Sequence, residues 1–206
     1  MSDLPASERA YLRVKDKILS GTLPSGSLDI GILADQMRMS VTPVREALAR
    51  LSVERLVRLA PHQGYVVATP SPTRLEHLYQ LSGALIHHSL ERACRSKQRV
   101  VTPGSANAAT GSYAEDMTLF LRGVVSSQPN GALIETVISL TDQLFPARRC
   151  ELRIFPGGQA ELAGLIALWS SGNLGGLRLR LRAYHRARIL KVDALGRLLI
   201  EEPRLN

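Results

Sequence analysis

Hydrophobic residues recur at helical spacing in three short segments near the start of the chain, residues 7–19, 30–37 and 43–51. In the third segment the apolar positions are i, i+3, i+4 and i+7, which predicts an amphipathic helix with one buried face. These positions are Val44, Ala47, Leu48 and Leu51. The second and third helices are separated by only a few residues, the tight connection that a helix-turn-helix needs.

The third helix has a well-marked start. Pro43 is expected at the first helical position, where its missing N–H costs nothing, and Thr42 is expected to cap the helix. Arg45 then falls on the face opposite the apolar one. A short helix that opens with small polar residues and a cation fits the major groove of DNA, where the first residues of a recognition helix meet base edges.

Two β-prone runs, residues 56–59 and 65–67, follow the three helices. A polar connection with a glycine at its end, residues 60–64, joins them, which is typical of a hairpin. Three helices followed by a hairpin predict a winged helix-turn-helix domain over residues 1–70.

Residues 71–206 show helical periodicity almost throughout, and the chain is therefore expected to be mainly α. We expect helices at about 73–96, 113–127, 130–148, 156–171 and 174–192, a loop over 97–112 and an irregular or extended tail over 194–206. The run at 177–182 alternates like a strand, but Leu177, Leu181 and Tyr184 also share a helical face. Because the neighbouring segments are helical, we predict a helix there. This half is thus expected to be an all-helical bundle.

Composition narrows the class of protein. The 206 residues are enough for two modest domains, and the formal net charge of +8 suits a polyanionic partner. Residues 71–206 carry most of the excess positive charge, which indicates a solvated arginine-rich surface, a pocket for an anionic effector or auxiliary phosphate contacts.

No apolar run is long enough for a membrane span, and the start of the chain does not resemble a signal peptide. Cys94 and Cys150 are expected to be buried free thiols of a cytoplasmic protein.

Several motifs in residues 8–68 resemble the DNA-binding domain of the GntR family of bacterial transcription regulators. They are Gly-Thr-Leu-Pro-Ser-Gly at 21–26, Leu-Ala at 33–34, Ser-Val-Thr-Pro-Val-Arg-Glu-Ala-Leu at 40–48 and Gln-Gly-Tyr-Val at 63–66. The family usually has arginine where this chain has Val41. A bidentate contact between arginine and guanine is then missing, and valine offers only an apolar contact, for example to a thymine methyl.

The predicted DNA contacts come from the third helix, the turn before it and the hairpin tip. They are Arg38, Ser40, Thr42, Arg45, His62, Gln63 and Gly64. Arg45 is expected to contact a guanine or a phosphate, with pairing along its own helix as the alternative. For Thr42, the alternative to a DNA contact is a role in capping the helix alone. For the hairpin tip, the alternative is an ordinary solvated turn. Arg50 is expected to form a surface ion pair with Glu46.

The helical second half resembles the fatty-acid-responsive (FCD-type) effector domain of the same family. The matching residues are Asp116 with Phe120, the run 130–133, Glu161 and Gly172-Asn173. The resemblance implies a divalent metal held by one aspartate and three histidines, but the aspartate and two of the histidines fall on Met117, Leu121 and Leu162. No histidine occurs between His88 and His185. We therefore expect neither a bound metal nor another cofactor.

Without a metal, the effector has two possible environments. An arginine such as Arg122 or Arg182 could take a carboxylate directly by a forked hydrogen bond if it points inward, with His185 as a further candidate ligand residue. Alternatively, Leu121 and Leu162 make the cavity apolar or close it, which we favour because an unpaired buried guanidinium is costly. The effector is accordingly a small organic acid, an apolar molecule, or absent.

These features predict a cytoplasmic, homodimeric transcription regulator that binds a double-stranded, palindromic operator under the control of a small molecule. No sequence motif of an enzyme is present, and no membrane partner is expected. One alternative is an effector-free dimeric DNA-binding protein. A second is a metal-dependent sensor or hydrolase built on His87 and Glu91, which lie four residues apart.

Overall fold

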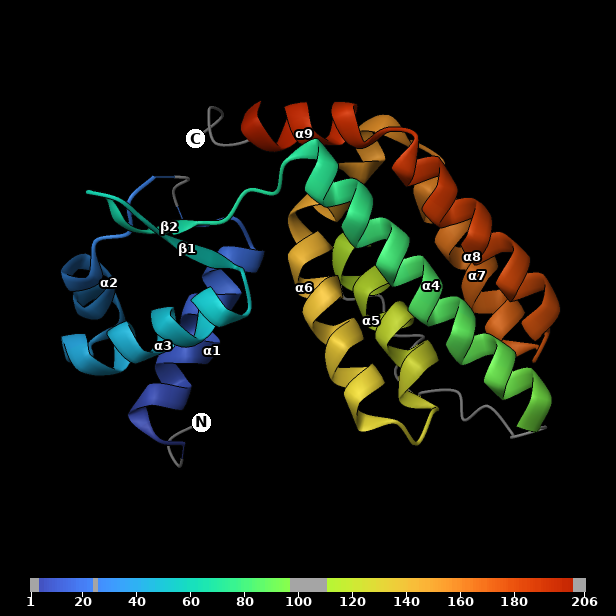
Figure 1. Ribbon diagram of the computed structural model, residues 1–206, viewed down its shortest axis with the longest axis horizontal. Helices are drawn as coiled ribbons and strands as arrows, with labels where there is room; N and C mark the ends of the chain where they lie inside the picture. Colours follow the sequence, from blue (N-terminus) through green and yellow to red (C-terminus); the bar gives the residue numbers. More distant parts are fainter. Residues whose placement is uncertain (1–3, 24–25, 97–110, 202–206) are drawn as a thin grey trace. The chain divides into compact units, whose positions relative to one another are not determined.

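The computed structural model describes residues 4–23, 26–96 and 111–201 (Figure 1). The chain divides into two compact units with a boundary between Thr69 and Pro70. Each unit is built around its own hydrophobic core. Among the described residues, none of the helices combines the length and apolar character that a membrane span requires.

The first unit consists of three helices and a two-stranded antiparallel sheet. Its elements are α1 (Ala6–Leu19), α2 (Ile30–Met37), α3 (Val41–Val53), β1 (Val57–Ala60) and β2 (Gly64–Val67). The strands pair from Val57 with Val67 to Ala60 with Gly64. The predicted apolar face of α3 is buried against this core, as expected. The predicted winged helix-turn-helix is therefore confirmed.

The start of α3 differs from the prediction. The helix begins at Val41, so Thr42 is its second residue and does not cap it; Ser40 occupies the cap position without a side-chain hydrogen bond to the helix. Pro43 is tolerated at the third position because the N–H groups of the first turn have no intrahelical acceptor. Ahead of α3, Arg38 ends α2 in the left-handed conformation (φ 52°, ψ 51°), which turns the chain sharply into α3.

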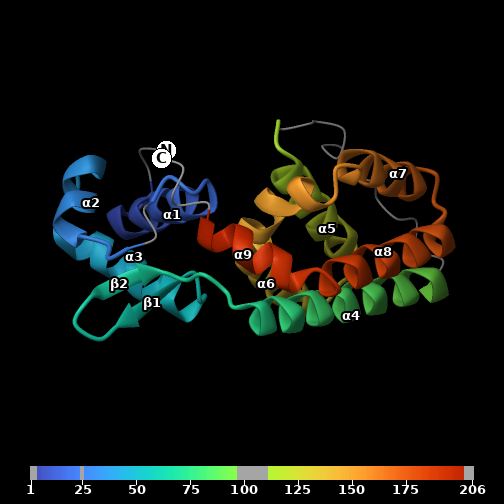
Figure 2. The ribbon, with the colours of Figure 1, turned by 90° about the horizontal axis from the view of Figure 1, so that it is seen from above.

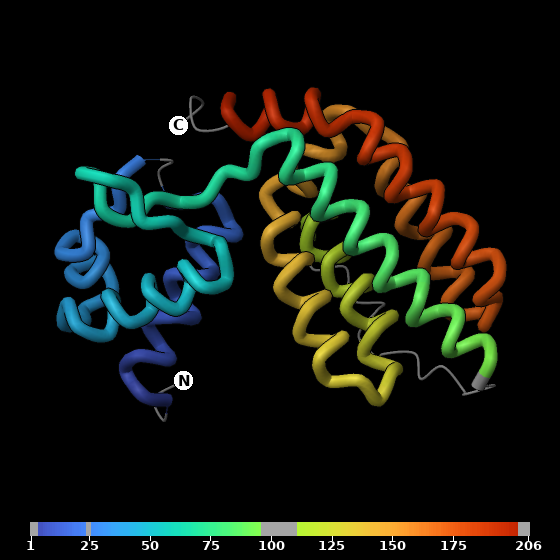
Figure 3. The backbone as a smooth tube through the Cα atoms, in the orientation of Figure 1, coloured from blue at the N-terminus to red at the C-terminus, as the bar shows by residue number. Residues whose placement is uncertain are grey.

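The described part of the second unit is entirely helical, so the predicted mainly-α class is confirmed. Its helices are α4 (Pro72–Ser96), α5 (Tyr113–Ser126), α6 (Gly131–Ile154), α7 (Gly158–Ser170), α8 (Leu174–Ile189) and α9 (Val192–Glu201). The helix α4 packs against α8 and α6, and α5 packs against α6. Figures 2 and 3 show α4 and α8 running side by side. The alternating run at 177–182 lies within α8, as predicted.

Other expectations for this unit need correction. The tail is not irregular from residue 194, because Val192, Leu195 and Leu199 bury one face of α9 at i, i+3 and i+7. The helix α6 includes Pro146 and ends at Ile154, six residues after the predicted end at 148. Cys94 is exposed rather than buried, whereas Cys150 is a buried free thiol. The predicted loop at 97–112 lies outside the described residues except for Gly111 and Ser112.

Candidate functional sites

The start of α3 and the turn before it form an exposed polar surface. Arg38, Ser40, Thr42 and Arg45 are all exposed, because the buried face of α3 turns the opposite side of the helix to solvent. Among the described residues, Arg45 has no hydrogen-bond or ion-pair partner. Val41 is also exposed (39%) and lies among these polar residues. This surface offers two cations, two hydroxyls and one apolar side chain to a partner.

The hairpin tip is a second exposed surface in the same unit. His62, Gln63 and Gly64 are exposed, and His62 (φ 60°) and Gly64 (φ 70°) both adopt the left-handed conformation that a tight connection requires. The Ser27 hydroxyl donates to the Gln63 carbonyl at 2.5 Å, which ties the tip to the chain ahead of α2. Sequence reasoning missed two exposed cations of the hairpin segment, Arg58 in β1 and Arg55 just before β1.

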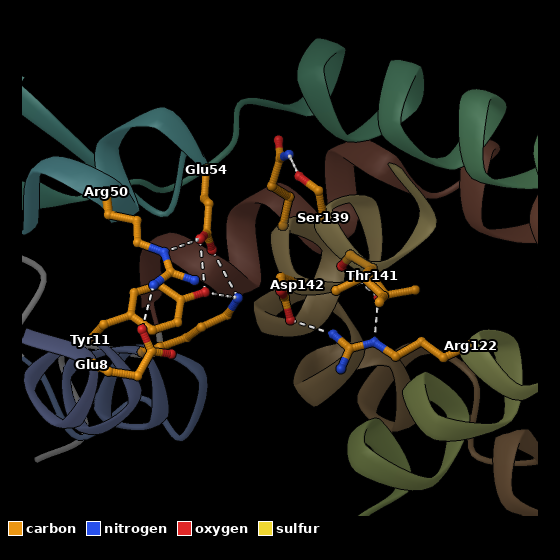
Figure 4. A network of polar contacts seen from close by, with 11 residues as sticks. Glu8, Tyr11, Arg50, Glu54, Arg122, Ser139, Thr141 and Asp142 are labelled. Atoms are coloured by element: carbon orange, nitrogen blue, oxygen red, sulfur yellow. Dashed lines mark hydrogen bonds and ion pairs between the residues drawn. The ribbon is translucent and has the colours of Figure 1, made fainter. Parts of the chain in front are cut away.

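The last turn of α3 is fixed to α1 by a polar cluster that includes Tyr11, Arg50 and Glu54 (Figure 4). The Arg50 guanidinium lies 3.5 Å from the centre of the Tyr11 ring and pairs with Glu8 at 2.7 Å. The Tyr11 hydroxyl donates to Glu54 at 2.8 Å, and burial raises its pKa. The predicted pair of Arg50 with Glu46 is therefore wrong: Arg50 pairs with Glu8 and, at 3.7 Å, with Glu54. The α1–α3 packing brings these longer-range partners within reach.

In the second unit, the positions where the FCD resemblance implies metal ligands lie inside the core. Met117 and Leu121 are fully buried and Leu162 is 2% exposed, and all three belong to the same hydrophobic cluster. Among the described residues, no group of three or more histidine, cysteine, aspartate or glutamate side chains is arranged to hold a metal ion.

Of the three predicted ligand residues, Arg182 and His185 line the same pocket, whereas Arg122 lies elsewhere. Arg122 donates to the Thr141 hydroxyl at 2.9 Å and pairs with the buried Asp142 at 2.5 Å (Figure 4). Its guanidinium is thereby held on α6. Arg182 and His185, in contrast, line one pocket of about 360 Å³.

His185 is a neutral side chain in the wall of this pocket. Its Nδ1–H donates to the Leu181 carbonyl at 2.8 Å, and its Nε2 lies 3.4 Å from the Ser82 hydroxyl, which can donate to it. Burial is the main reason why its pKa falls to about 4. The ring therefore offers the pocket no positive charge near neutral pH.

Sequence reasoning missed a buried polar cluster centred on Glu151 of α6. The carboxylate accepts hydrogen bonds from three tyrosine hydroxyls, contributed by three other helices: Tyr79 of α4 (2.8 Å), Tyr113 of α5 (2.7 Å) and Tyr184 of α8 (3.0 Å). Burial is the main cause that raises the pKa of each of these hydroxyls. They consequently remain protonated donors to the carboxylate.

Two buried arginines accompany Glu151. Arg188 pairs with Glu151 at 3.0 Å and with Glu161 of α7 at 2.7 Å, so the cluster connects five helices. Arg148 is fully buried and donates through one nitrogen to Thr118 and to the Thr141 carbonyl. Within the described residues, its other two nitrogens, Nε and Nη2, have no hydrogen-bond partner. Arg148 is therefore the member of this cluster whose hydrogen-bonding groups are only partly paired within the described residues.

The first unit is similar to a described family of proteins. Residues 6–67 match the family of bacterial regulatory proteins named gntR. An uncharacterised HTH-type transcriptional regulator of Agrobacterium vitis, from the TAR-I ttuE-ttuC' intergenic region, is 38% identical over 77 residues. That match covers 37% of this chain and 45% of the relative, so it spans less than half of the curated protein.

Solved structures share the fold over nearly the whole chain. E. coli McbR/YncC superposes with a TM-score of 0.69 at 21% identity, covering 92% of this chain and 97% of that one. A putative GntR transcriptional regulator from Rhodococcus sp. RHA1 superposes with a TM-score of 0.72 at 16% identity, covering 90% and 96%. At these identities the comparison establishes the two-part architecture alone.

Proposed function

We propose that this chain is a transcription regulator of the GntR type, which binds duplex DNA through its first unit and is controlled through its second. The observation that carries the proposal is the exposed start of α3, where Arg45 has no partner among the described residues, in a domain that matches the gntR family. The proposal gives the chain no catalytic step.

In the proposed complex, α3 enters the major groove with its N-terminal end toward the bases. Arg45 donates a forked pair of hydrogen bonds to a guanine, and Val41 contacts a thymine methyl. Arg38, Ser40 and Thr42 hold the phosphates on either side, which sets the register without reading sequence. His62, Gln63 and Gly64 at the hairpin tip reach the adjacent minor groove, where the lack of a side chain on Gly64 permits a close approach.

One such helix reads only a few base pairs, so the proposal includes a homodimer bound to a palindromic operator. Two recognition helices then occupy half-sites about one helical turn apart. A ligand in the second unit acts by changing the fit of the two helices to these half-sites. We propose a cytoplasmic location on the same basis, since the operator lies in the chromosome.

For the second unit we propose an FCD-type effector domain that works without the metal histidines. Support comes from its helical architecture and from Met117, Leu121 and Leu162, which fill the implied ligand positions with buried apolar side chains. The sensor or hydrolase based on His87 is less well supported, because Arg182 donates to the His87 Nε2 at 3.2 Å and occupies a metal-binding lone pair.

Selection from a library of random duplexes tests the proposed function. The purified protein is expected to enrich one sequence with two-fold symmetry. In a fluorescence-anisotropy competition, that duplex should bind at least about a thousandfold more tightly than a scrambled duplex at the same salt concentration. Failure to enrich any sequence, or equal affinity for both duplexes, would show that the chain is not a sequence-specific regulator.

A further inference from the structure

The pocket between α4 and α8 combines an apolar floor with a row of cations. Arg178, Arg182 and Arg186 lie four residues apart along α8 and therefore share one face of the helix. All three line the pocket and are exposed. The helix α4 contributes the opposite wall, which includes Ala84 and His87.

The charges around this pocket are not balanced. Arg178 pairs with Glu91 of α4 at 3.5 Å. Arg182 contacts His87, whose Nε2 accepts its hydrogen bond at 3.2 Å and supplies no negative charge. In the part of the chain that the structure describes, neither Arg182 nor Arg186 has a carboxylate partner. Two guanidinium groups are thus available to an anion at the same rim.

The floor of the pocket is apolar and is large enough for a small organic molecule. Leu90, Leu181 and Ile189 line it together with Tyr79, and its volume is about 360 Å³, which lies in the range of ligand pockets. Gly83 lets α4 pack closely on α8 at the wall of the pocket, since a Cβ at this position would lie 3.1 Å from the His185 ring. The neutral His185 adds no further charge to the floor.

We infer that this pocket binds an apolar molecule that carries one doubly charged anionic head, of the phosphate-monoester type. A phosphate monoester has a charge of about −1.5 to −2 near neutral pH and three acceptor oxygens. It can accept forked hydrogen bonds from Arg182 and Arg186 at once, whereas a single carboxylate balances only one of them. The apolar body of the ligand lies on the leucine and isoleucine floor.

This inference rests on the proposed function and names the effector class for its second unit. The occupied pocket would hold α4 and α8 together, and α4 begins two residues after the boundary of the first unit. A ligand that stiffens this pair of helices therefore acts on the segment that continues directly into the DNA-binding unit.

Calorimetric titration of the full chain in phosphate-free buffer tests the inference with four small probes. Phenyl phosphate, benzoate and phenol share one apolar body and differ in head charge, while inorganic phosphate supplies the head alone. Phenyl phosphate should bind about tenfold more tightly than benzoate or inorganic phosphate. Phenol should give no measurable binding.

Matched variants locate the binding site. Arg182→Gln and Arg186→Gln should each weaken phenyl phosphate binding about tenfold. Arg180→Gln removes the same charge from an exposed position of α8 that does not line the pocket, so it should leave binding unchanged. Ala84→Trp should abolish binding because the indole fills the pocket.

Several results would overturn the inference. Equal binding of phenyl phosphate and benzoate would refute the doubly charged head, and equal binding of phenyl phosphate and inorganic phosphate would refute the apolar floor. Equal effects of the Arg180 and Arg182 variants would indicate a non-specific surface effect. If no probe binds and Ala84→Trp lowers the particle mass in sedimentation, the pocket is covered by a second copy. None of these results affects the DNA selection, so failure of the ligand site and failure of the proposed function remain distinguishable.

Discussion

Arg188 of α8 donates through Nε to Glu151 of α6 at 3.0 Å, and neither side chain is more than 1% exposed. A buried ion pair of this kind is costly to break, because removal of one partner leaves an uncompensated charge in the interior. The three tyrosine hydroxyls that also donate to Glu151 make its carboxylate the point at which the helices of the second unit are joined.

Glu151→Gln should therefore lower the free energy of unfolding of the second unit by about 3–5 kcal/mol. The amide removes one of the two carboxylates that pair with Arg188, the other being that of Glu161, and turns an N–H₂ group toward groups that are themselves donors. Urea denaturation followed by Trp169 fluorescence measures this change, because the only tryptophan of the chain is buried in the second unit. Glu135→Gln, an exposed change on the same helix, should change the value by less than about 0.5 kcal/mol. Equal effects of the two substitutions would contradict the assigned role.

The two buried arginines should respond differently to the same substitution. Arg188→Met leaves the buried Glu151 carboxylate without its arginine partner and should lower the free energy of unfolding by about 3–5 kcal/mol. Arg148→Met removes a guanidinium whose Nε and Nη2 have no partner in the described residues, so the lost hydrogen bonds are offset by relief of an unfavourable burial. Its cost should be less than half that of Arg188→Met in the same fluorescence assay. A larger cost for Arg148→Met would mean that its free edge has a bound partner in solution.

Burial of His185 should make the second unit less stable in acid. Its folded pKa is about 4, below the value of about 6.5 in an unfolded chain. As the pH falls through 6.5 the unfolded chain takes up a proton that the folded chain does not bind, so the free energy of unfolding decreases until about pH 4. The decrease from pH 7 to pH 5 should be about 2 kcal/mol from this residue alone.

Comparison of His185→Asn with His77→Asn isolates that contribution. His77 is exposed on α4, so its replacement should leave the slope of stability against pH almost unchanged. His185→Asn should flatten the slope between pH 7 and pH 5. An unchanged slope in the His185 variant would mean that another group causes the acid sensitivity.

The sequence was most informative where structure depends on local spacing. The bounds of α2 could be predicted because its apolar positions and its flanking polar residues lie within a single short segment. The exposed surface at the start of α3 followed from helical periodicity in the same way. Local reasoning failed for Arg50, because Tyr11 and Glu8 reach it from α1 rather than from its own helix.

The Glu151 cluster could not be predicted for a related reason. Tyr79, Tyr113, Glu151 and Tyr184 lie on four helices and meet only when the bundle is packed. A charged residue within a helix normally indicates a solvated face, so Glu151 and Arg188 carried no sign of burial. The tail was misjudged because α9 is short, and its buried face depends on packing against α4 and α6.

We propose that the start of α3 reads DNA sequence, and the affinity of two arginine variants for the selected duplex tests this role most directly. Arg45 and Arg50 lie on the same helix and carry the same charge, but Arg45 is unpaired in the described structure whereas Arg50 is held on Tyr11 and Glu8. Arg45→Ala should weaken binding by about 1–3 kcal/mol and relax the preference at one position of each half-site. Arg50→Ala should leave affinity within about twofold, since a charge already paired on the protein contributes little to the DNA contact. Unchanged binding by Arg45→Ala, or equal losses in both variants, would contradict the assignment of α3 as the recognition helix.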